Sequence, residues 1–126
     1  MVVTPVYPRR VLVVDDNRDA ADSLALILRR MGHYVRVCYE GSDAVEAARQ
    51  QRADVVFLDL VMPGIDGYEV ARQLRADPQL RHVLIVATTG FGQEEDRERS
   101  RKAGIDQHLL KPLDLDFLKS LLGRRR

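Results

Sequence analysis

Residues 55–59 read Val-Val-Phe-Leu-Asp, a run of four apolar side chains that ends in a single carboxylate. An apolar run of this length is typical of a strand that is covered on both faces of a parallel sheet. Asp59 is followed by Leu-Val-Met at residues 60–62, so it lies neither in a polar turn nor beside a helix cap. We therefore interpret Asp59 as a functional carboxylate at the end of a buried strand.

The rest of the chain alternates between apolar runs and segments with helical spacing. Further strands are predicted at residues 11–14, 34–38, 83–86 and 107–110. The charged segment 93–103, which ends at Gly104, predicts one helix, and apolar stripes predict four more. The stripes consist of Leu24, Ile27, Leu28 and Met31; Ala44, Val45, Ala47 and Ala48; Val70, Ala71 and Leu74; and Leu115, Leu118, Leu121 and Leu122.

Five strands that alternate with five helices predict an α/β protein with parallel strands and right-handed crossovers. The commonest small fold of this kind is a flavodoxin-like doubly wound sheet with strand order 2-1-3-4-5, which binds ligands beyond the carboxyl ends of its strands. With 126 residues in all, we assign 1–9 to an N-terminal tail, 10–123 to one domain and 124–126 to a basic C-terminal tail.

Composition excludes several classes of protein. The formal net charge of +1 gives no overall attraction to nucleic acid or to a membrane surface. No apolar segment is long enough to span a membrane, and the N-terminus does not resemble a secretory signal. The single cysteine, Cys38, cannot form an internal disulfide and is typical of a reducing compartment. These features predict a cytoplasmic protein.

Three carboxylates are expected at one edge of the sheet. Asp15 and Asp16 end the first strand, and Asp59 ends the third, its neighbour in the predicted order. Their mutual repulsion would be relieved by a hard divalent cation such as Mg²⁺, and the absence of His or Cys from the group argues against zinc. For Asp15 and Asp16, a role in a turn or helix cap is an equal alternative, with Asn17 as another possible cap.

Two further polar positions lie at the same edge. Lys111 follows the fifth strand and precedes Pro112, so its ammonium group can point back toward the carboxylates. Thr88 and Thr89 end the fourth strand, and either hydroxyl could donate a hydrogen bond to a phosphoryl oxygen there. Spacing alone does not choose between the two threonines, and a cap is the commoner use of an isolated Thr.

The chain resembles the receiver domains of two-component response regulators. The resemblance runs from about residue 10 to residue 122 and is carried by five segments in order. These segments are Val-Leu-Val-Val-Asp-Asp-Asn at 11–17, Asp-Val-Val-Phe-Leu-Asp at 54–59, Met-Pro-Gly-Ile-Asp-Gly at 62–67, Ala-Thr-Thr-Gly at 87–90 and Leu-Lys-Pro at 110–112.

The resemblance implies a function and a set of roles. Asp59 is then the acceptor of a phosphoryl group from a phosphohistidine on a sensor histidine kinase or a histidine phosphotransfer domain. Mg²⁺ (or Mn²⁺) is held by Asp16, Asp59 and the backbone carbonyl of Val61, with Asp15 acting through water. Lys111 pairs with the phosphoryl group, and the peptide bond between Lys111 and Pro112 is cis. Family spacing selects Thr89 as the switch hydroxyl.

The resemblance also implies a conformational switch. Phosphorylation would draw Thr89 inward and remodel the face formed by helix 93–103, strand 107–110 and the helix over 115–122, where a downstream protein could bind. The family mostly has Tyr or Phe at position 108, whereas this chain has His108. His108 is therefore either a switch residue whose burial depends on pH or an ordinary hydrogen-bonded side chain.

Other functions remain open at this point. A Mg²⁺-dependent phosphatase would use Asp59 as a nucleophile, but the chain has no inserted loop for a substrate pocket, so we do not expect an enzyme. A phosphorylation-independent interaction module of the same shape is the second alternative. A nucleotide- or flavin-binding fold would need a Gly-rich loop where Asp-Asp-Asn stands at 15–17. Both a free-standing regulator and the C-terminal receiver of a hybrid kinase fit the sequence.

Overall fold

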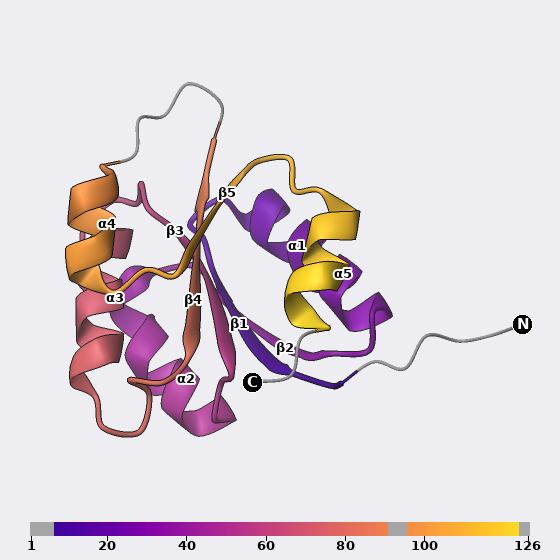
Figure 1. Cartoon of the computed structure of the whole chain (residues 1–126), viewed down its shortest axis with the longest axis horizontal. Helices are drawn as coiled ribbons and strands as arrows, with labels where there is room; N and C mark the ends of the chain where they lie inside the picture. Colours follow the sequence, from indigo (N-terminus) through magenta and orange to yellow (C-terminus); the bar gives the residue numbers. More distant parts are fainter. Residues whose placement is uncertain (1–6, 91–95, 124–126) are drawn as a thin grey trace, which may run out of the picture.

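The computed structural model describes residues 7–90 and 96–123 of the chain. A single parallel sheet has the strand order β2-β1-β3-β4-β5, which confirms the predicted flavodoxin-like doubly wound fold. Figure 1 shows α1 and α5 on one face of this sheet and α2, α3 and α4 on the other. The strands are β1 (Arg10–Val14), β2 (Tyr34–Cys38), β3 (Val55–Asp59), β4 (Leu84–Thr89) and β5 (Gln107–Leu110). The helices are α1 (Arg18–Arg30), the short 3-10 turn η1 (Gly41–Asp43), α2 (Ala44–Gln51), α3 (Gly67–Ala76), α4 (Arg97–Ala103) and α5 (Leu115–Leu122).

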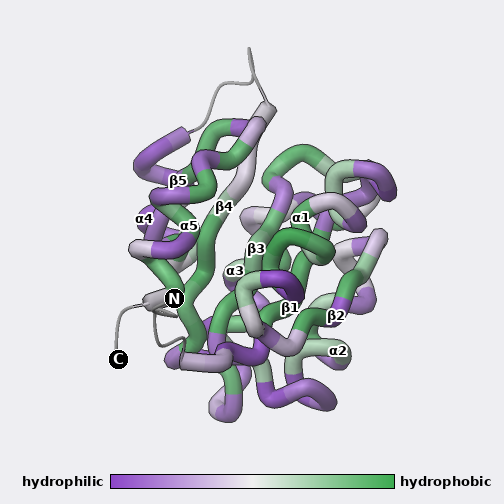
Figure 2. Tube along the Cα trace, turned by 90° about the vertical axis from the view of Figure 1, so that its right-hand side faces the viewer, coloured by the Kyte–Doolittle hydropathy of each residue, from purple (hydrophilic) through white to green (hydrophobic). Residues whose placement is uncertain are grey.

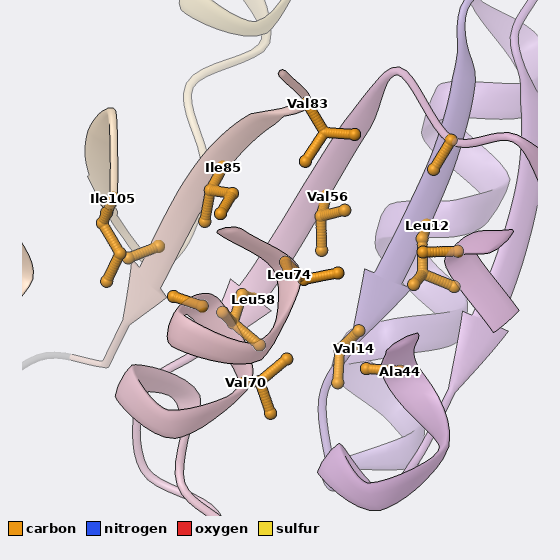
Figure 3. Packing of buried hydrophobic residues seen from close by; sticks show 14 of the residues in the cluster. Leu12, Val14, Ala44, Val56, Leu58, Val70, Leu74, Val83, Ile85 and Ile105 are labelled. Carbon is orange, nitrogen blue, oxygen red and sulfur yellow. The ribbon is translucent and has the colours of Figure 1, made fainter. Parts of the chain in front are cut away.

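Successive side chains of the central strands point to opposite faces and form two apolar cores. On one face, Leu58 of β3 packs with Val70 and Leu74 of α3, as Figure 3 shows. On the other face, Phe57 packs in a cluster with Leu118 of α5. Burial on both faces explains why residues 11–14 of β1 and 55–58 of β3 are all apolar; Figure 2 colours hydrophobic residues green. The sheet is thereby a rigid platform for residues at its carboxyl edge.

The helix boundaries follow from local capping. The side chain of Asp66 accepts a hydrogen bond from the amide of Glu69 and begins α3, and Asp114 begins α5 in the same way, as predicted. Gly32, just beyond α1, has a φ of +99°, which favours glycine and ends the helix. Within the two described ranges, no helix is long and apolar enough to cross a membrane.

The predicted start of one helix was wrong. The helix expected over 93–103 begins at Arg97, because Asp96 has an extended backbone and caps the helix through the amide of Arg99; residues 91–95 lie outside the described part of the chain. The apolar run at 83–86 belongs to β4, which runs from Leu84 to Thr89 and ends at the threonine that the sequence placed at the end of the fourth strand. β4 extends beyond the apolar run because pairing continues on both sides, from Thr88 to β3 and from Thr89 to β5.

Candidate functional site

The carboxyl edge of the sheet brings the three predicted carboxylates together. Val14 and Leu58 are paired in register, so Asp15 and Asp59 leave their neighbouring strands side by side. One carboxylate oxygen from each of Asp15, Asp16 and Asp59 can be chosen so that all three lie within 4.8 Å of one another. Asp15 and Asp59 are only 4% and 5% exposed, whereas Asp16 is exposed to solvent. The group forms a half-open cluster of oxygen ligands.

Local hydrogen bonds orient these carboxylates. The amide of Asn17 donates to Oδ1 of Asp15 at 2.9 Å, and the amide of Val61 donates to Oδ1 of Asp59 at 3.3 Å. The cap of α1 is Asn17, whose side chain accepts from the amide of Ala20 at 3.0 Å. Because Asn17 fills the capping position, the carboxylate of Asp16 is left for the cluster.

Lys111 lies over the same edge. Its Nζ is 2.7 Å from Oδ2 of Asp15 and 3.9 Å from Oδ2 of Asp59. The lysine is placed by the end of β5, where its amide donates to the carbonyl of Thr89 at 2.8 Å and where the following peptide bond to Pro112 is cis. The fold thus places the ammonium group of Lys111 facing the carboxylates, where the sequence predicted a positive charge.

The electrostatics of the cluster suit a divalent cation. Burial, followed by the charge of Asp15, raises the pKa of Asp59, and Lys111 partly opposes both effects, so that the pKa is about 7. Three carboxylates and one ammonium group leave two negative charges when all are ionised, which a single divalent ion neutralises. An all-oxygen ligand set is the one that Mg²⁺ prefers. The residues present therefore fit a magnesium ion.

The two candidate threonines occupy different places at the end of β4. Thr88 pairs with Asp59 across the ladder, and Thr89 pairs with Leu110, next to Lys111. Both are buried, at 3% and 5% exposure. Both threonines therefore lie at the carboxyl edge of the sheet, close to the acidic cluster, as predicted.

His108 contacts α4. Its Nε2 lies 2.7 Å from Oγ of Ser100, and its Nδ1 lies 3.3 Å from a guanidinium nitrogen of Arg97. The side chain is half-buried in this position. The structure thus places His108 between β5 and α4, on the face for which the sequence predicted a conformational change.

The first turn of α4 is also tied to α3. Arg99 forms an ion pair with Asp66 at 2.9 Å, and its guanidinium lies 4.1 Å from the ring centroid of Tyr68. The hydroxyl of Tyr68 accepts a hydrogen bond from the amide of Asp96 at 3.1 Å. Because α3 begins soon after Asp59, these contacts connect the loop that follows the acidic cluster with the start of α4.

Gly67 is a site residue to which the sequence analysis gave no role. A Cβ atom at this position would lie 2.4 Å from the carbonyl oxygen of Asp59 and 2.7 Å from the Cα of Leu60. The first residue of α3 therefore packs directly on the backbone that carries Asp59. The glycine that follows the capping Asp66 is the sequence signal for this close approach.

Comparison with known proteins agrees with this geometry. PilH of Pseudomonas aeruginosa is 36% identical over 109 residues, which cover 86% of this chain and 90% of that protein. Among solved structures, the receiver domain of the sensor histidine kinase PA1611 from P. aeruginosa, with a magnesium ion coordinated in its active site cleft, is 33% identical with a TM-score of 0.81, covering 92% of this chain and 95% of that one.

A third relative is bound to a signalling partner. The receiver domain of the response regulator Ssk1 from Saccharomyces cerevisiae, solved with the histidine phosphotransfer protein Ypd1, is 25% identical with a TM-score of 0.82 and covers 94% of this chain and 89% of that one. Residues 11–122 match the response regulator receiver domain, which is nearly the whole chain. The chain therefore belongs to the receiver domain family of two-component and phosphorelay signalling proteins.

Proposed function

We propose that this receiver domain accepts a phosphoryl group on Asp59 from a phosphohistidine, with Mg²⁺ bound at the acidic cluster. The observation that carries the proposal is the convergence of Asp15, Asp16 and Asp59 with Lys111 at one edge of the sheet. A carboxylate that is 5% exposed and flanked by a second buried carboxylate destabilises the fold unless positive charge offsets it, and Lys111 supplies one positive charge for three carboxylates.

The proposed chemistry is the displacement of histidine from phosphorus. A carboxylate oxygen of Asp59 forms the new P–O bond as the P–N bond to the donor imidazole breaks. Lys111, now held by Asp15, is close enough to turn toward a phosphoryl oxygen on Asp59. Asp16, Asp59 and the carbonyl of Val61 would hold the magnesium ion, with Asp15 acting through water. The bound ion supplies charge neutralisation at the phosphoryl oxygens.

The proposed response to phosphorylation begins at Thr89. Its hydroxyl moves to donate a hydrogen bond to the phosphoryl group, and the face formed by α4, β5 and α5 is remodelled as a shift between pre-existing states. The contacts of His108 with Ser100 and Arg97 lie within that face, so they are candidates for being made or broken in the shift. A downstream protein that recognises this face would bind the two conformations with different affinities.

The proposed partner is a sensor histidine kinase or a histidine phosphotransfer protein. The complex of Ypd1 with the receiver domain of Ssk1 supports the second type of donor. The similarity to PilH supports a free-standing regulator, and the similarity to the receiver of the sensor kinase PA1611 supports a domain of a hybrid kinase. Both assignments place the same chemistry at Asp59.

Phosphorylation by a small phosphodonor tests the proposal. The protein is incubated with acetyl phosphate and Mg²⁺, and intact mass is measured together with the lability of the product to hydroxylamine, which cleaves acyl phosphates. We expect one added phosphoryl group in the native protein and none in Asp59→Asn or in the presence of EDTA. Addition of a phosphoryl group to the Asp59→Asn variant would show that another residue is the acceptor.

The same preparation separates the alternatives. An interaction module that works without phosphorylation would bind neither Mg²⁺ nor beryllofluoride, a phosphoryl mimic. A phosphatase would instead hydrolyse p-nitrophenyl phosphate with repeated turnover in the presence of Mg²⁺. We expect stoichiometric modification without turnover on this phosphoester.

A further inference from the structure

A cavity lies next to the acidic cluster, on the face of the sheet that α1 and α5 cover. Its volume is about 430 Å³, within the range of roughly 300–1,000 Å³ that is usual for small-molecule sites. Figure 1 shows α1 and α5 lying on this same face. The cavity is floored by Val13 and Phe57 of the sheet and walled by Leu24 and Ile27 of α1 and Leu118 of α5. The cavity is therefore apolar over most of its lining.

Small side chains on α1 leave this space open. Ala20 and Ser23, which also line the cavity, stand in the first two turns of the helix, and both side chains are small. Leu118 and Phe57 are already buried in the core beneath, so they do not fill the gap from the other side. The void is thus a consequence of which residues α1 presents to the sheet.

One end of the cavity is polar. Asp15, Thr88 and Lys111 line it there. Both oxygens of Asp15 already accept hydrogen bonds, from the amide of Asn17 and from Lys111. Thr88 is 3% exposed, and it brings the one hydroxyl group among these three residues. A hydroxyl can donate one hydrogen bond and accept others.

The charge around the polar end restricts the ligand. Lys111 is the single cation facing the carboxylates of Asp15, Asp16 and Asp59 in the described structure, so a ligand anion would meet excess negative charge. An uncharged oxygen can accept from the Thr88 hydroxyl and from a remaining N–H of Lys111 without that repulsion.

We propose that this cavity binds a small neutral molecule with a compact aromatic or branched aliphatic body and one carbonyl or hydroxyl oxygen. The apolar body lies between α1 and α5, and the oxygen accepts hydrogen bonds from Thr88 and Lys111. The proposal concerns a second site and does not depend on phosphorylation of Asp59.

Lys111 links this site to the acidic cluster. The same ammonium group lines the cavity and lies 3.9 Å from Asp59, so a ligand oxygen and a phosphoryl oxygen compete for its N–H groups. A saturating ligand should weaken the binding of beryllofluoride by roughly fivefold, near the lower end of measured coupling between sites. Beryllofluoride must weaken ligand binding by the same factor, because coupling of two binding equilibria is reciprocal.

Titration with matched probes tests the proposal. Benzamide, benzyl alcohol and benzoate share an aromatic ring and differ in the charge and chemistry of the head group. Each is titrated into the complete ¹⁵N-labelled chain without Mg²⁺, and backbone amide shifts are followed. We expect benzamide and benzyl alcohol to shift the resonances of α1 and of residues 111–113 with a Kd of roughly 1 mM, a value typical of very weak ligands. Benzoate should bind at least tenfold more weakly.

Substitutions in the cavity provide the controls. Ser23→Leu fills the cavity from an exposed position that tolerates a larger side chain, and it should abolish benzamide binding. Leu26→Ala changes the same helix at a residue that is 49% exposed and does not line the cavity, so it should leave Kd unchanged. Thr88→Val removes only the hydroxyl and should raise Kd for benzamide by roughly fivefold, the effect of one lost hydrogen bond.

Two results would overturn the proposal. One is the absence of saturable shifts with both neutral probes in the native protein. The other is binding that is unchanged in Ser23→Leu, while that variant loses phosphoryl transfer from a histidine phosphotransfer protein. This second result would mean that the cavity receives a side chain of the protein donor. Phosphorylation of native protein by acetyl phosphate is measured separately, so failure here is distinct from failure of the proposed function.

Discussion

The imidazole of His108 and the hydroxyl of Ser100 are hydrogen-bonded, with Nε2 and Oγ 2.7 Å apart. Ser100 is 1% exposed on the inner side of α4, so this bond joins β5 to the buried side of the helix. A guanidinium group can only donate, so the contact with Arg97 makes Nδ1 an acceptor and leaves Nε2 to donate to Ser100. The position where the family mostly carries an aromatic ring thus holds a specific polar contact in this chain.

Replacing the histidine should change the response and not the chemistry. His108→Tyr is expected to accept a phosphoryl group on Asp59 as the native protein does, since residue 108 is not in the acidic cluster. Loss of the bond to Ser100 should alter the equilibrium between α4 conformations, because one such bond contributes about 1 kcal/mol. Beryllofluoride-induced amide shifts in α4 and β5 measure this. Identical shifts in both proteins would show that His108 has no part in switching, and Ser100→Ala is the matched control for the same bond.

Asp59 should make the metal-free protein less stable as pH rises. Its pKa is raised to about 7 in the folded state, chiefly by burial, so it ionises in the unfolded chain first. The free energy of unfolding therefore falls between about pH 4 and pH 7, from the unfolded to the folded pKa. Asp59→Asn should be more stable than the native protein at pH 8 by about 1–3 kcal/mol, which is less than the full shift would give at about 1.4 kcal/mol per pKa unit, because solvent screens part of the charge.

Urea denaturation in EDTA at pH 4 and pH 8 measures this difference. At the lower pH the two proteins should approach each other, because the carboxyl group is protonated in the folded state and only about half ionised in the unfolded chain. Adding Mg²⁺ at pH 8 should stabilise the native protein and reduce the advantage of Asp59→Asn. An asparagine variant that is less stable at pH 8 without metal would contradict the electrostatic argument.

Gly67 should be the least replaceable glycine near the site. In Gly67→Ala the new Cβ would collide with the backbone of Asp59 and Leu60, and the backbone must shift. We expect a loss of about 2–3 kcal/mol in the free energy of unfolding, as for other overpacked positions, together with weaker Mg²⁺ binding. Gly64→Ala is the control: its φ is +78° with nothing within 4 Å, so it should cost only about 1 kcal/mol from backbone strain. Equal losses would show that the close contact at Gly67 is easily relaxed.

His33 should give the fold a second pH dependence, remote from the acids. It is 5% exposed, and its Nδ1 accepts a hydrogen bond from the amide of Arg9 at 3.0 Å. Burial and the charge of Arg9 lower its pKa, so the unfolded chain takes up the proton first as pH falls below about 6.5. Stability is therefore complete above this pH and declines below it, by about 1 kcal/mol for the lost bond to the amide.

Chemical denaturation between pH 7 and pH 5 checks the role of His33. His33→Asn retains an acceptor that does not titrate, so its stability should depend less on pH over this range. His82→Asn, at an exposed histidine, should keep the pH dependence of the native protein. If both variants behave alike, His33 is not the titrating group.

Local patterns in the sequence were sufficient for most of the fold. Apolar runs located the strands, and Asp66 and Asp114 marked the starts of their helices, because these signals depend on neighbouring residues alone. The start of α4 was wrong, since charged residues at 93–96 are compatible with a helix and only the capping by Asp96 shows where it begins. The end of β4 at Thr89 was predicted, and the pairing of Thr88 with β3 and of Thr89 with β5 explains why the strand continues past its apolar run.

The site likewise has features that the sequence predicts and features that depend on contacts between distant elements. Strand order alone predicted that Asp15 and Asp59 would meet, and the structure places them together. The bond between His108 and Ser100, the contact of Gly67 with Asp59 and the cavity beside α1 depend on distances between elements. They could be found only once side chains were packed, because spacing along the chain does not determine how closely two helices approach a sheet.

The ion pair between Lys111 and Asp15 joins residues that are 96 positions apart. A growing polypeptide emerging from the ribosome would carry all three carboxylates long before it carried the lysine. Completion of the fifth strand is thus what finishes the acceptor, and partial or misassembled chains would have the acids without their counter-charge. A phosphodonor that requires the assembled edge would consequently pass its signal only to molecules in which this edge has been synthesised and folded.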